Sequence, residues 1–468
     1  MAAFLDRSRS IAGPGFSRWL VPPAALCIHL CIGQVYAFSV FNKPMAQLLC
    51  TAQAACPPAT AKALSTVPGD WSIVTLGWIF SIAILFLGLA AAVFGRWVER
   101  VGPRMAMFVA AILFCGGLII AGFGVSLHNL VIVFLGYGVV GGCGLGIGYI
   151  SPVSTLIKWF PDRPGLATGT AIMGFGGGAL IGAPLAVILM KHYSSPTSNG
   201  VAPTMITMGI LYFVYMIVGS LIVRLPAVGW KPAGWIAPTA EAAAARMMTT
   251  RNVLVGEAIK TPQFWLLWAV LFLNVTAGIG VLGQASLMSQ DVLGVSAGAA
   301  AGFVGLLSLF NMVGRIFWAS TSDTLGRKRT YMIFFALGAV LYALTPTLGH
   351  WHAIVLFVLA YGIILSMYGG GFATVPAYLK DMFGTVNVGA IHGVLLTAWS
   401  AAGIAGPYLL NKIREVEIAQ GVPKADAYSV TMYLMAALLV VGFICNWLVR
   451  PVADRYYVAT TGVGEATA

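Results

Sequence analysis

The sequence predicts an all-α membrane protein in which twelve transmembrane helices form two pseudo-symmetric bundles of six. Hydrophobic residues make up 59% of the 468 residues and charged residues only 9%, whereas soluble domains contain about 25% charged residues. About twelve apolar stretches are long enough to cross a hydrocarbon core of roughly 30 Å as helices, which satisfy their own backbone hydrogen bonds there. The two halves of the chain also repeat each other.

The first half, residues 1–224, contains six of these apolar stretches. We expect its spans at Trp19 to Phe41, Trp71 to Phe94, Pro103 to Val125, Asn129 to Trp159, Gly165 to Met190 and Ala202 to Arg224.

A linker at residues 225–260 separates the halves, and it is richer in alanine, proline and charge than the spans are. It predicts a cytoplasmic connection between two bundles. The second half, residues 261–468, is expected to span at Phe264 to Met288, Ala297 to Ser320, Lys328 to Leu344, Trp351 to Leu379, Val388 to Asn411 and Ala427 to Val449.

An internal repeat with an offset of 224 residues relates the halves. The matching pairs are Tyr137 and Tyr361, Pro152 and Pro376, Gly165 and Gly389, Gly169 and Gly393, and Gly182 and Gly406. The charged turn at residues 99–104 recurs at the same offset at residues 323–328. Because each half has an even number of spans, the repeats share one orientation, which is the parallel two-half arrangement found in transporters.

The net charge of +12 comes from the loops. With both termini cytoplasmic, 19 of the 26 Lys and Arg residues fall inside, six outside and one, Arg315, in the membrane. This positive-inside pattern explains the basic balance and argues against a nucleic-acid partner. The first span is too long for a removed signal peptide and lacks a cleavage-site pattern. Cys50 and Cys56 share the first outward loop, so a disulfide and two free thiols are both open.

Arg315 is a permanent cation inside an otherwise apolar span, about eight residues before Asp323 and so roughly 12 Å from the charged turn. A guanidinium at that depth costs at least about 3 kcal/mol and usually faces a substrate path. Asn311, four residues earlier, shares its helical face. Because a planar guanidinium matches a carboxylate with two parallel hydrogen bonds, the pair predicts an anion site. The alternative is an arginine bonded to backbone carbonyls.

No acidic residue is expected at the depth of Arg315, since all fourteen Asp and Glu residues fall in expected loops, helix ends or tails. The cation is therefore available to a substrate anion, but the usual carboxylate proton carrier is missing. His29, near the middle of the first span, is the candidate for proton coupling. A neutral histidine bonded between helices is the alternative there, and His392 is expected to be structural.

Two sets of motifs resemble known families. The charged turns, with Glu99 and Arg100 in the first and Asp323 and Arg327 in the second, resemble the signature loops of the major facilitator superfamily, although Glu99 stands where an aspartate is usual. The segments 33–39, 144–149 and 158–169 resemble the oxalate/formate antiporter family, which is related to the monocarboxylate transporters. The resemblance implies the major facilitator fold, gate roles for the four charged residues and a carboxylate-binding role for Arg315.

The eleventh span departs from that family. The segment Gly393 to Ser400 aligns with one in which oxalate exchangers carry a lysine, and it places Trp399 at that position. One cation suits one carboxylate, whereas a dianion would leave its second charge unpaired in a dry site. Trp399 therefore favours a monocarboxylate, unless it only packs.

Other polar residues in the spans are candidate walls of the site, with interhelical hydrogen bonding as the alternative. They are Gln34, Tyr36, Tyr149, Tyr361 and Tyr368. The resemblance favours Tyr36 and Tyr149, whose counterparts line the family's cavity.

Together these features predict a secondary active transporter of a small monocarboxylate of the lactate, pyruvate or formate class, working by alternating access in a bacterial inner membrane. We expect a functional monomer embedded in lipid, with a small organic anion and a proton as co-substrates. An empty Arg315 would oppose reorientation, and a bound anion would neutralise it. An anion exchanger such as an oxalate/formate antiporter and a carboxylate-sensing receptor are the alternatives. No metal-ligand cluster, cofactor motif or hydrolytic triad appears in the sequence, so we expect neither metal nor cofactor and no enzyme activity.

Overall fold

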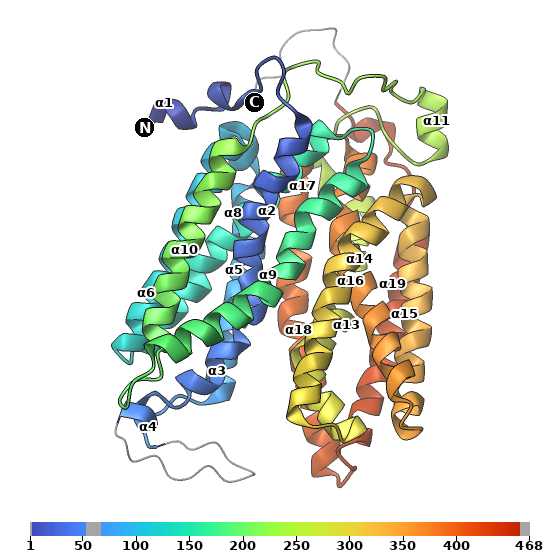
Figure 1. Cartoon of the computed structure of the whole chain (residues 1–468). Helices are drawn as coiled ribbons and strands as arrows, with labels where there is room; N and C mark the ends of the chain where they lie inside the picture. The colour runs from blue at the N-terminus through green and yellow to red at the C-terminus, as the bar shows by residue number, and fades with distance from the viewer. Residues whose placement is uncertain (1, 53–66, 459–468) are drawn as a thin grey trace.

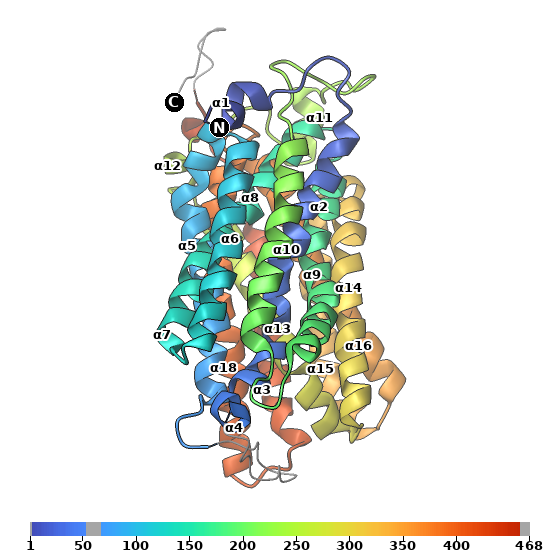
Figure 2. The same ribbon diagram turned by 60° about the vertical axis from the view of Figure 1, so that its left-hand side comes forward.

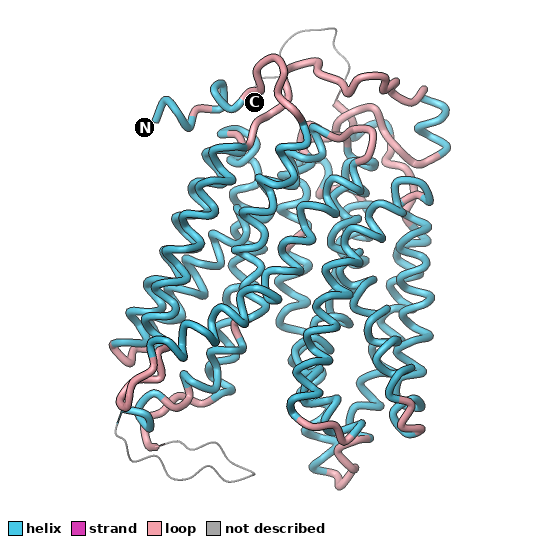
Figure 3. The backbone as a smooth tube through the Cα atoms, viewed as in Figure 1, coloured by secondary structure: helices cyan, strands magenta, loops and turns pink. Residues whose placement is uncertain are grey.

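The computed structural model describes residues 2–52 and 67–458. The regular secondary structure in these residues is helical, and Figure 3 shows helices joined by loops. Twelve helical segments of the described chain are long and apolar enough to cross a membrane. The predicted fold class is therefore confirmed.

The first bundle contains the helices of residues 21–222 (Figure 1). Its spanning helices are α2 (Val21–Ile32) with its continuation η3 (Gly33–Ala37), α5 (Ile73–Val101), α6 (Pro103–Ser126), α7 (Leu130–Val133) with the π-helical η4 (Phe134–Gly141) and α8 (Gly142–Trp159), α9 (Pro164–Tyr193) and α10 (Val201–Ile222). Two short helices, α3 (Ser39–Met45) and α4 (Leu48–Ala52), follow the first span.

The second bundle contains the helices of residues 262–448. They are α13 (Pro262–Leu293), α14 (Ala297–Leu325), α15 (Arg327–His350), α16 (Ile354–Phe383), α17 (Val388–Leu395) with α18 (Thr397–Ala419), and α19 (Ser429–Leu448).

Several helices are longer than the predicted spans, because they continue beyond the apolar part of the sequence. α5 continues to Val101 and not only to Phe94, because a helix satisfies its own backbone in water as well as in lipid. α15 likewise continues past Leu344 to His350, with Pro346 inside it. The eleventh span is interrupted at Leu396, where α17 gives way to α18.

The first and last described segments, α1 (Ala2–Leu5) and the residues that follow α19, lie at the same end of the molecule, which we call the termini face (Figures 1 and 2). The other end is called the opposite face. The bundles stand side by side, and α5 of the first packs against α17 and α18 of the second while α9 packs against α14 and α16. Cys50, near the opposite face, is disulfide-bonded, whereas Cys56 lies outside the described residues.

Glycines allow these helices of opposite bundles to approach closely. An added Cβ at Gly169 of α9 would lie 2.7 Å from the Arg315 carbonyl oxygen of α14. At Gly393 of α17, its partner in the repeat, an added Cβ would overlap the Ala91 carbonyl of α5. The repeat seen in the sequence therefore corresponds to two equivalent contacts between the bundles.

Candidate functional site

Arg315 lies on α14 at the junction of the two bundles and is fully buried. Its Nε donates to Oδ1 of Asn311 over 3.1 Å, and its Nη1 donates to the carbonyl oxygen of Ile172, on α9 of the other bundle, over 3.2 Å. Within the described chain its Nη2 has no hydrogen-bond partner. Asn311 therefore orients the guanidinium, and one of its three nitrogens, Nη2, has no partner in the described residues.

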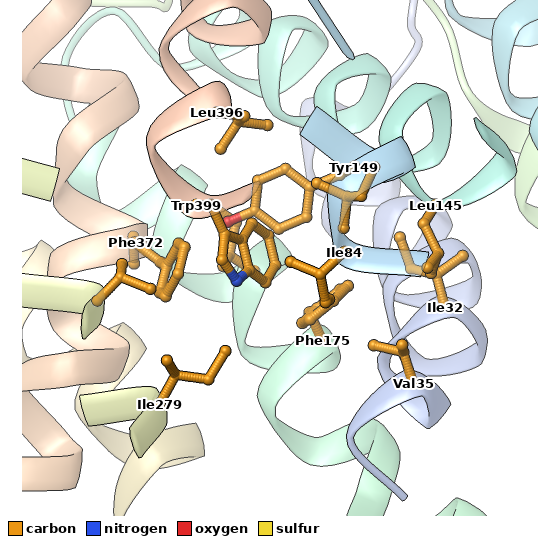
Figure 4. Packing of buried hydrophobic residues seen from close by; sticks show 14 of the residues in the cluster. Ile32, Val35, Ile84, Leu145, Tyr149, Phe175, Ile279, Phe372, Leu396 and Trp399 are labelled. Atoms are coloured by element: carbon orange, nitrogen blue, oxygen red, sulfur yellow. The ribbon is translucent and has the colours of Figure 1, made fainter. Parts of the chain in front are cut away.

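Aromatic rings surround this guanidinium. Its central carbon lies 5.4 Å from the ring centre of Phe372 and 5.8 Å from that of Phe175. The indole of Trp399 packs against both rings, at centroid distances of 4.4 Å from Phe372 and 5.3 Å from Phe175 (Figure 4). Gly176 gives the cation room, since an added Cβ there would lie 2.8 Å from Nε. Such an apolar enclosure strengthens any charge interaction inside it.

Two further donors are buried beside the aromatic rings without a partner in the described residues, Oη of Tyr149 and Nε1 of Trp399. The two rings lie 5.3 Å apart and edge to face, and the Tyr149 phenol is within electrostatic reach of Arg315. An unsatisfied buried donor costs about 1–3 kcal/mol. Together with Arg315 Nη2 they make three donors, which suits a carboxylate with its two acceptor oxygens.

Tyr36 and Tyr368 meet across the bundle junction. Tyr36 follows α2 within η3 and Tyr368 lies on α16, and their hydroxyl oxygens are 3.1 Å apart. The Tyr36 ring packs edge to face on Phe175 at 5.1 Å and lies 6.4 Å from Trp399. Both tyrosines therefore join the aromatic enclosure, and Tyr36 is its partly exposed member.

The structure places two other predicted wall residues away from Arg315. Gln34 accepts a hydrogen bond from the Tyr137 hydroxyl over 3.0 Å, inside the first bundle. The Tyr361 hydroxyl contacts the sulfur atoms of Met288 and Met432 at 3.3 and 3.1 Å, beside a pocket in the second bundle. Neither makes a contact with the guanidinium among those the structure records.

His29 is buried in α2 between two backbone carbonyls. Its Nδ1 lies 2.7 Å from the Ala171 oxygen and its Nε2 3.2 Å from the Tyr149 oxygen. A neutral ring donates to one of these carbonyls, and an imidazolium donates to both. His29 thus holds α2 against α9 and α8, beside the residues that surround Arg315.

The second charged turn closes the termini face between the bundles. Both oxygens of Asp323 accept backbone N–H groups from the first turn of α9, those of Gly165 and Leu166, each over 2.9 Å. The start of a helix attracts anions because its first N–H groups lack helical partners. Arg327 donates to Asp323 over 2.6 Å and to Asp381 over 3.1 Å, which keeps the carboxylate in place.

The first charged turn makes the equivalent contact. Glu99 accepts the N–H of Gly389, in the first turn of α17, over 3.2 Å, and it also bonds Ser154 and Lys158. Arg100 is exposed at the end of α5. The glutamate that replaces the usual aspartate therefore reaches the helix start that the repeat predicts.

Sequence reasoning missed three residues near these sites, Phe175, Phe372 and Asp381. A signal for Phe175 was present, because the offset of 224 residues relates it to Trp399. Phe372 and Asp381 had none, since an aromatic residue in an apolar helix and a carboxylate at a helix end are both common.

Comparison with known proteins settles the family. The family model described as Major Facilitator Superfamily matches residues 24–407. The chain belongs to the major facilitator superfamily. This membership and the twelve spans make it a multi-pass membrane transporter.

Relatives of this major facilitator superfamily transporter include several carriers of carboxylates. The oxalate:formate antiporter of Oxalobacter formigenes is 29% identical over 67% of this chain and 69% of its own. The apicoplast pyruvate carrier 1 of Toxoplasma gondii is 23% identical over 89% of this chain and 86% of its own. Monocarboxylate transporter 13 of Bos taurus is 24% identical over 73% and 74%.

Solved structures agree with the fold. The human organic anion transporter MFSD10 superposes with a TM-score of 0.64 at 13% identity, over 93% of this chain and 100% of that one. The fucose:proton symporter of E. coli superposes with a TM-score of 0.63 at 13% identity over the same shares.

Proposed function

We propose that this protein is a secondary active transporter that carries a small monocarboxylate together with a proton by alternating access. The observation that carries the proposal is the set of three buried donors without partners, Arg315 Nη2, Tyr149 Oη and Trp399 Nε1, at the junction of the bundles. We further propose that it works as a monomer in a bacterial inner membrane, with the termini face in the cytoplasm.

The charge of the site supports a monoanion. Of the Lys and Arg residues in the sequence, Arg315 is the one that the predicted topology places within the membrane. The aromatic rings of Phe175 and Phe372 lie next to its guanidinium. The carboxylate of lactate or pyruvate would accept from Nη2, and Tyr149 and Trp399 would donate to its oxygens. A second carboxylate would meet apolar rings and lose its hydration without a partner, at a cost of several kcal/mol.

Alternating access would use the two carboxylate contacts at the termini face. Asp323 holds the start of α9, and Glu99 holds the start of α17. With both contacts made, the bundles are joined at this face, and the site would be reached past Tyr36 from the opposite face. Release to the other side requires both carboxylates to leave the helix starts, so these residues would act as gates and not as ligands.

A second candidate function is anion exchange. It is favoured by the relative named oxalate:formate antiporter, which shares 29% identity with this chain. In an exchanger, the empty carrier does not return. Transport would then need an anion on both sides and would ignore a proton gradient.

Uptake into proteoliposomes tests these functions. We would measure labelled lactate and labelled oxalate with and without an inward proton gradient, and with and without preloaded anion, for wild type, Arg315→Gln and Arg315→Lys. We expect lactate uptake to rise with the gradient. Arg315→Gln should lower uptake at least about 30-fold, which corresponds to about 2 kcal/mol for the lost partner of a buried charge.

Arg315→Lys serves as the matched control, because it keeps the charge and removes the planar pair of donors. We expect it to retain more uptake than Arg315→Gln and less than wild type. Full uptake by Arg315→Gln would overturn the anion site. Oxalate uptake that depends only on preloaded anion would establish the exchanger instead.

A further inference from the structure

His392 is the second buried histidine near the bundle junction, and its environment differs from that of His29. It lies on α17 with 1% of its surface exposed, and both ring nitrogens lack a hydrogen-bond partner within the described residues. A neutral imidazole has one donor and one acceptor, so both capacities are unused. A packing role would favour the opposite, because buried polar groups are normally satisfied.

The internal repeat supplies a direct comparison. The offset of 224 residues relates His392 to Thr168, and it relates Tyr149 to Ala373. In one repeat, the Thr168 hydroxyl donates to the Ala373 carbonyl of the other bundle over 2.7 Å. In the other, His392 faces Tyr149 at a ring distance of 5.9 Å, and neither imidazole nitrogen has a hydrogen-bond partner in the described residues. The polar side chain at this position therefore makes a hydrogen bond to the other bundle in one half, at Thr168, and none in the other half, at His392.

We propose that His392 is the proton-binding residue that couples the anion to the proton. This inference rests on the proposed function and names the proton site that the function requires. An incoming proton bonds to the lone pair of one ring nitrogen, and the imidazolium later returns it to water on the other side. An O–H bond of the hydronium donor breaks as the N–H bond forms, and the reverse exchange takes place on release.

The position of Tyr149 between the two groups provides the linkage. Its phenol is within electrostatic reach of Arg315, and its ring packs near His392. A buried imidazolium without an anion is unfavourable, so His392 is neutral when the site is empty. A carboxylate bound at Arg315 attracts the proton, and by reciprocity the proton raises the affinity for the carboxylate. The proton balances the charge of the anion, so one carboxylate and one proton cross together without moving net charge.

The contacts that join α17 to the first bundle at the termini face determine from which side a proton reaches His392. α17 packs along α5 and α8, with Gly389 beside Glu99 and Gly393 against Ala91. While these contacts hold, His392 is sealed from the termini face. When the bundles part there, α17 leaves α5 and α8, and the imidazole meets water on that side.

Charged and titratable groups on the neighbouring elements are few at the level of His392. Tyr149 of α8 faces it directly, with His29 of α2 behind that tyrosine at a ring distance of 5.4 Å. The other charged or titratable groups of the elements packed on α17 are Arg96, Glu99 and Arg100 of α5, Cys143 and Lys158 of α8, Tyr361, Tyr368, Tyr378, Lys380 and Asp381 of α16, Glu257 of α12 (Val255–Ala258), Asp291 of α13, and Tyr408, Lys412, Arg414, Glu415 and Glu417 of α18.

The test compares the same substitution at the two buried histidines. In proteoliposomes, His392→Gln should lose the effect of the proton gradient, so that the ratio of lactate uptake with and without the gradient falls at least tenfold, to about one. Exchange of labelled for unlabelled lactate needs no net proton transfer and should persist, with a flat pH profile. His29→Gln should keep its dependence on the gradient.

A second variant and a binding measurement separate coupling from folding. His392→Thr introduces the residue found at the equivalent position 168, and it should show the same uncoupled exchange. In calorimetry in buffers of different ionisation enthalpy, wild type should take up about one proton per lactate bound and both variants none.

Three results with the variants would overturn the inference. One is gradient-driven accumulation by His392→Gln, and another is loss of coupling in His29→Gln alone. The third is loss of exchange in both His392 variants, which would show a structural or ligand-binding role. If wild type exchanges lactate but its uptake does not depend on the proton gradient, the role of His392 in coupling is refuted, whereas carboxylate transport is still supported. A wild type with no carboxylate transport refutes the proposed function itself.

Discussion

At the scale of single residues, the site combines one permanent cation with aromatic rings. The guanidinium of Arg315 is oriented by Asn311 and flanked by Phe175 and Phe372. Trp399 occupies the place where the resemblance puts a lysine, and its ring is fully buried against both phenylalanines. We therefore expect the charge of the preferred substrate to depend on the residue at position 399.

We predict that Trp399→Lys shifts the preference toward a dianion. The new ammonium would pair with a second carboxylate, which otherwise stays unpaired at a cost of several kcal/mol. Oxalate exchange relative to lactate exchange should rise at least about tenfold, or about 1.4 kcal/mol. Trp399→Phe is the control, because it keeps the apolar wall and should leave the preference for lactate. An unchanged ratio in Trp399→Lys would contradict the assignment of this position.

At the scale of helices, the two charged turns join the bundles at the termini face by the same kind of contact, a carboxylate bonded to the backbone N–H groups of a helix start. Asp323 accepts two amides at the start of α9, and Glu99 accepts one at the start of α17. The pairing follows from the repeat, which relates Glu99 to Asp323 and Gly165 to Gly389. The sequence predicted gate roles for these carboxylates but not the backbone groups that they bond, because a helix start exposes backbone groups whatever its side chains are.

We predict that removing one carboxylate charge loosens only its own helix start. Hydrogen bonds to a charged acceptor contribute about 1.5–3 kcal/mol. In Asp323→Asn, the backbone amides of residues 165–168 should exchange hydrogen at least about tenfold faster, while those of residues 388–392 change little. Glu99→Gln should give the reverse pattern, and each variant controls for the other. Equal effects at both helix starts in either variant would show that the contacts do not act separately.

At the scale of the whole molecule, the site exists only where the bundles meet. Arg315 belongs to the second bundle and donates to Ile172 of the first, while Tyr149 and Phe175 of the first face Trp399 of the second. A carboxylate bound there would therefore bridge the bundles.

Substrate should consequently stabilise the folded protein. A ligand at about 100 times its Kd adds about 2.7 kcal/mol of stability. We predict that lactate raises the Tm of the detergent-solubilised wild type by a few degrees and leaves that of Arg315→Gln unchanged. Sodium chloride at equal ionic strength is the control for screening. An equal shift in the variant would place the lactate site elsewhere.

The sequence by itself determined the twelve spans, the repeat and the family, because a bilayer requires long apolar helices and because repeated halves conserve spacing. It also singled out Arg315, since an isolated cation in an apolar span is costly wherever it lies. Only the tertiary structure decided which polar residues surround that cation. Gln34, Tyr36, Tyr361 and Tyr368 are alike as polar side chains in apolar helices, yet helix rotation and the bundle junction bring only Tyr36 and Tyr368 to the site. The contrast between the bonded His29 and the unbonded His392 likewise depends on neighbours far away in the chain.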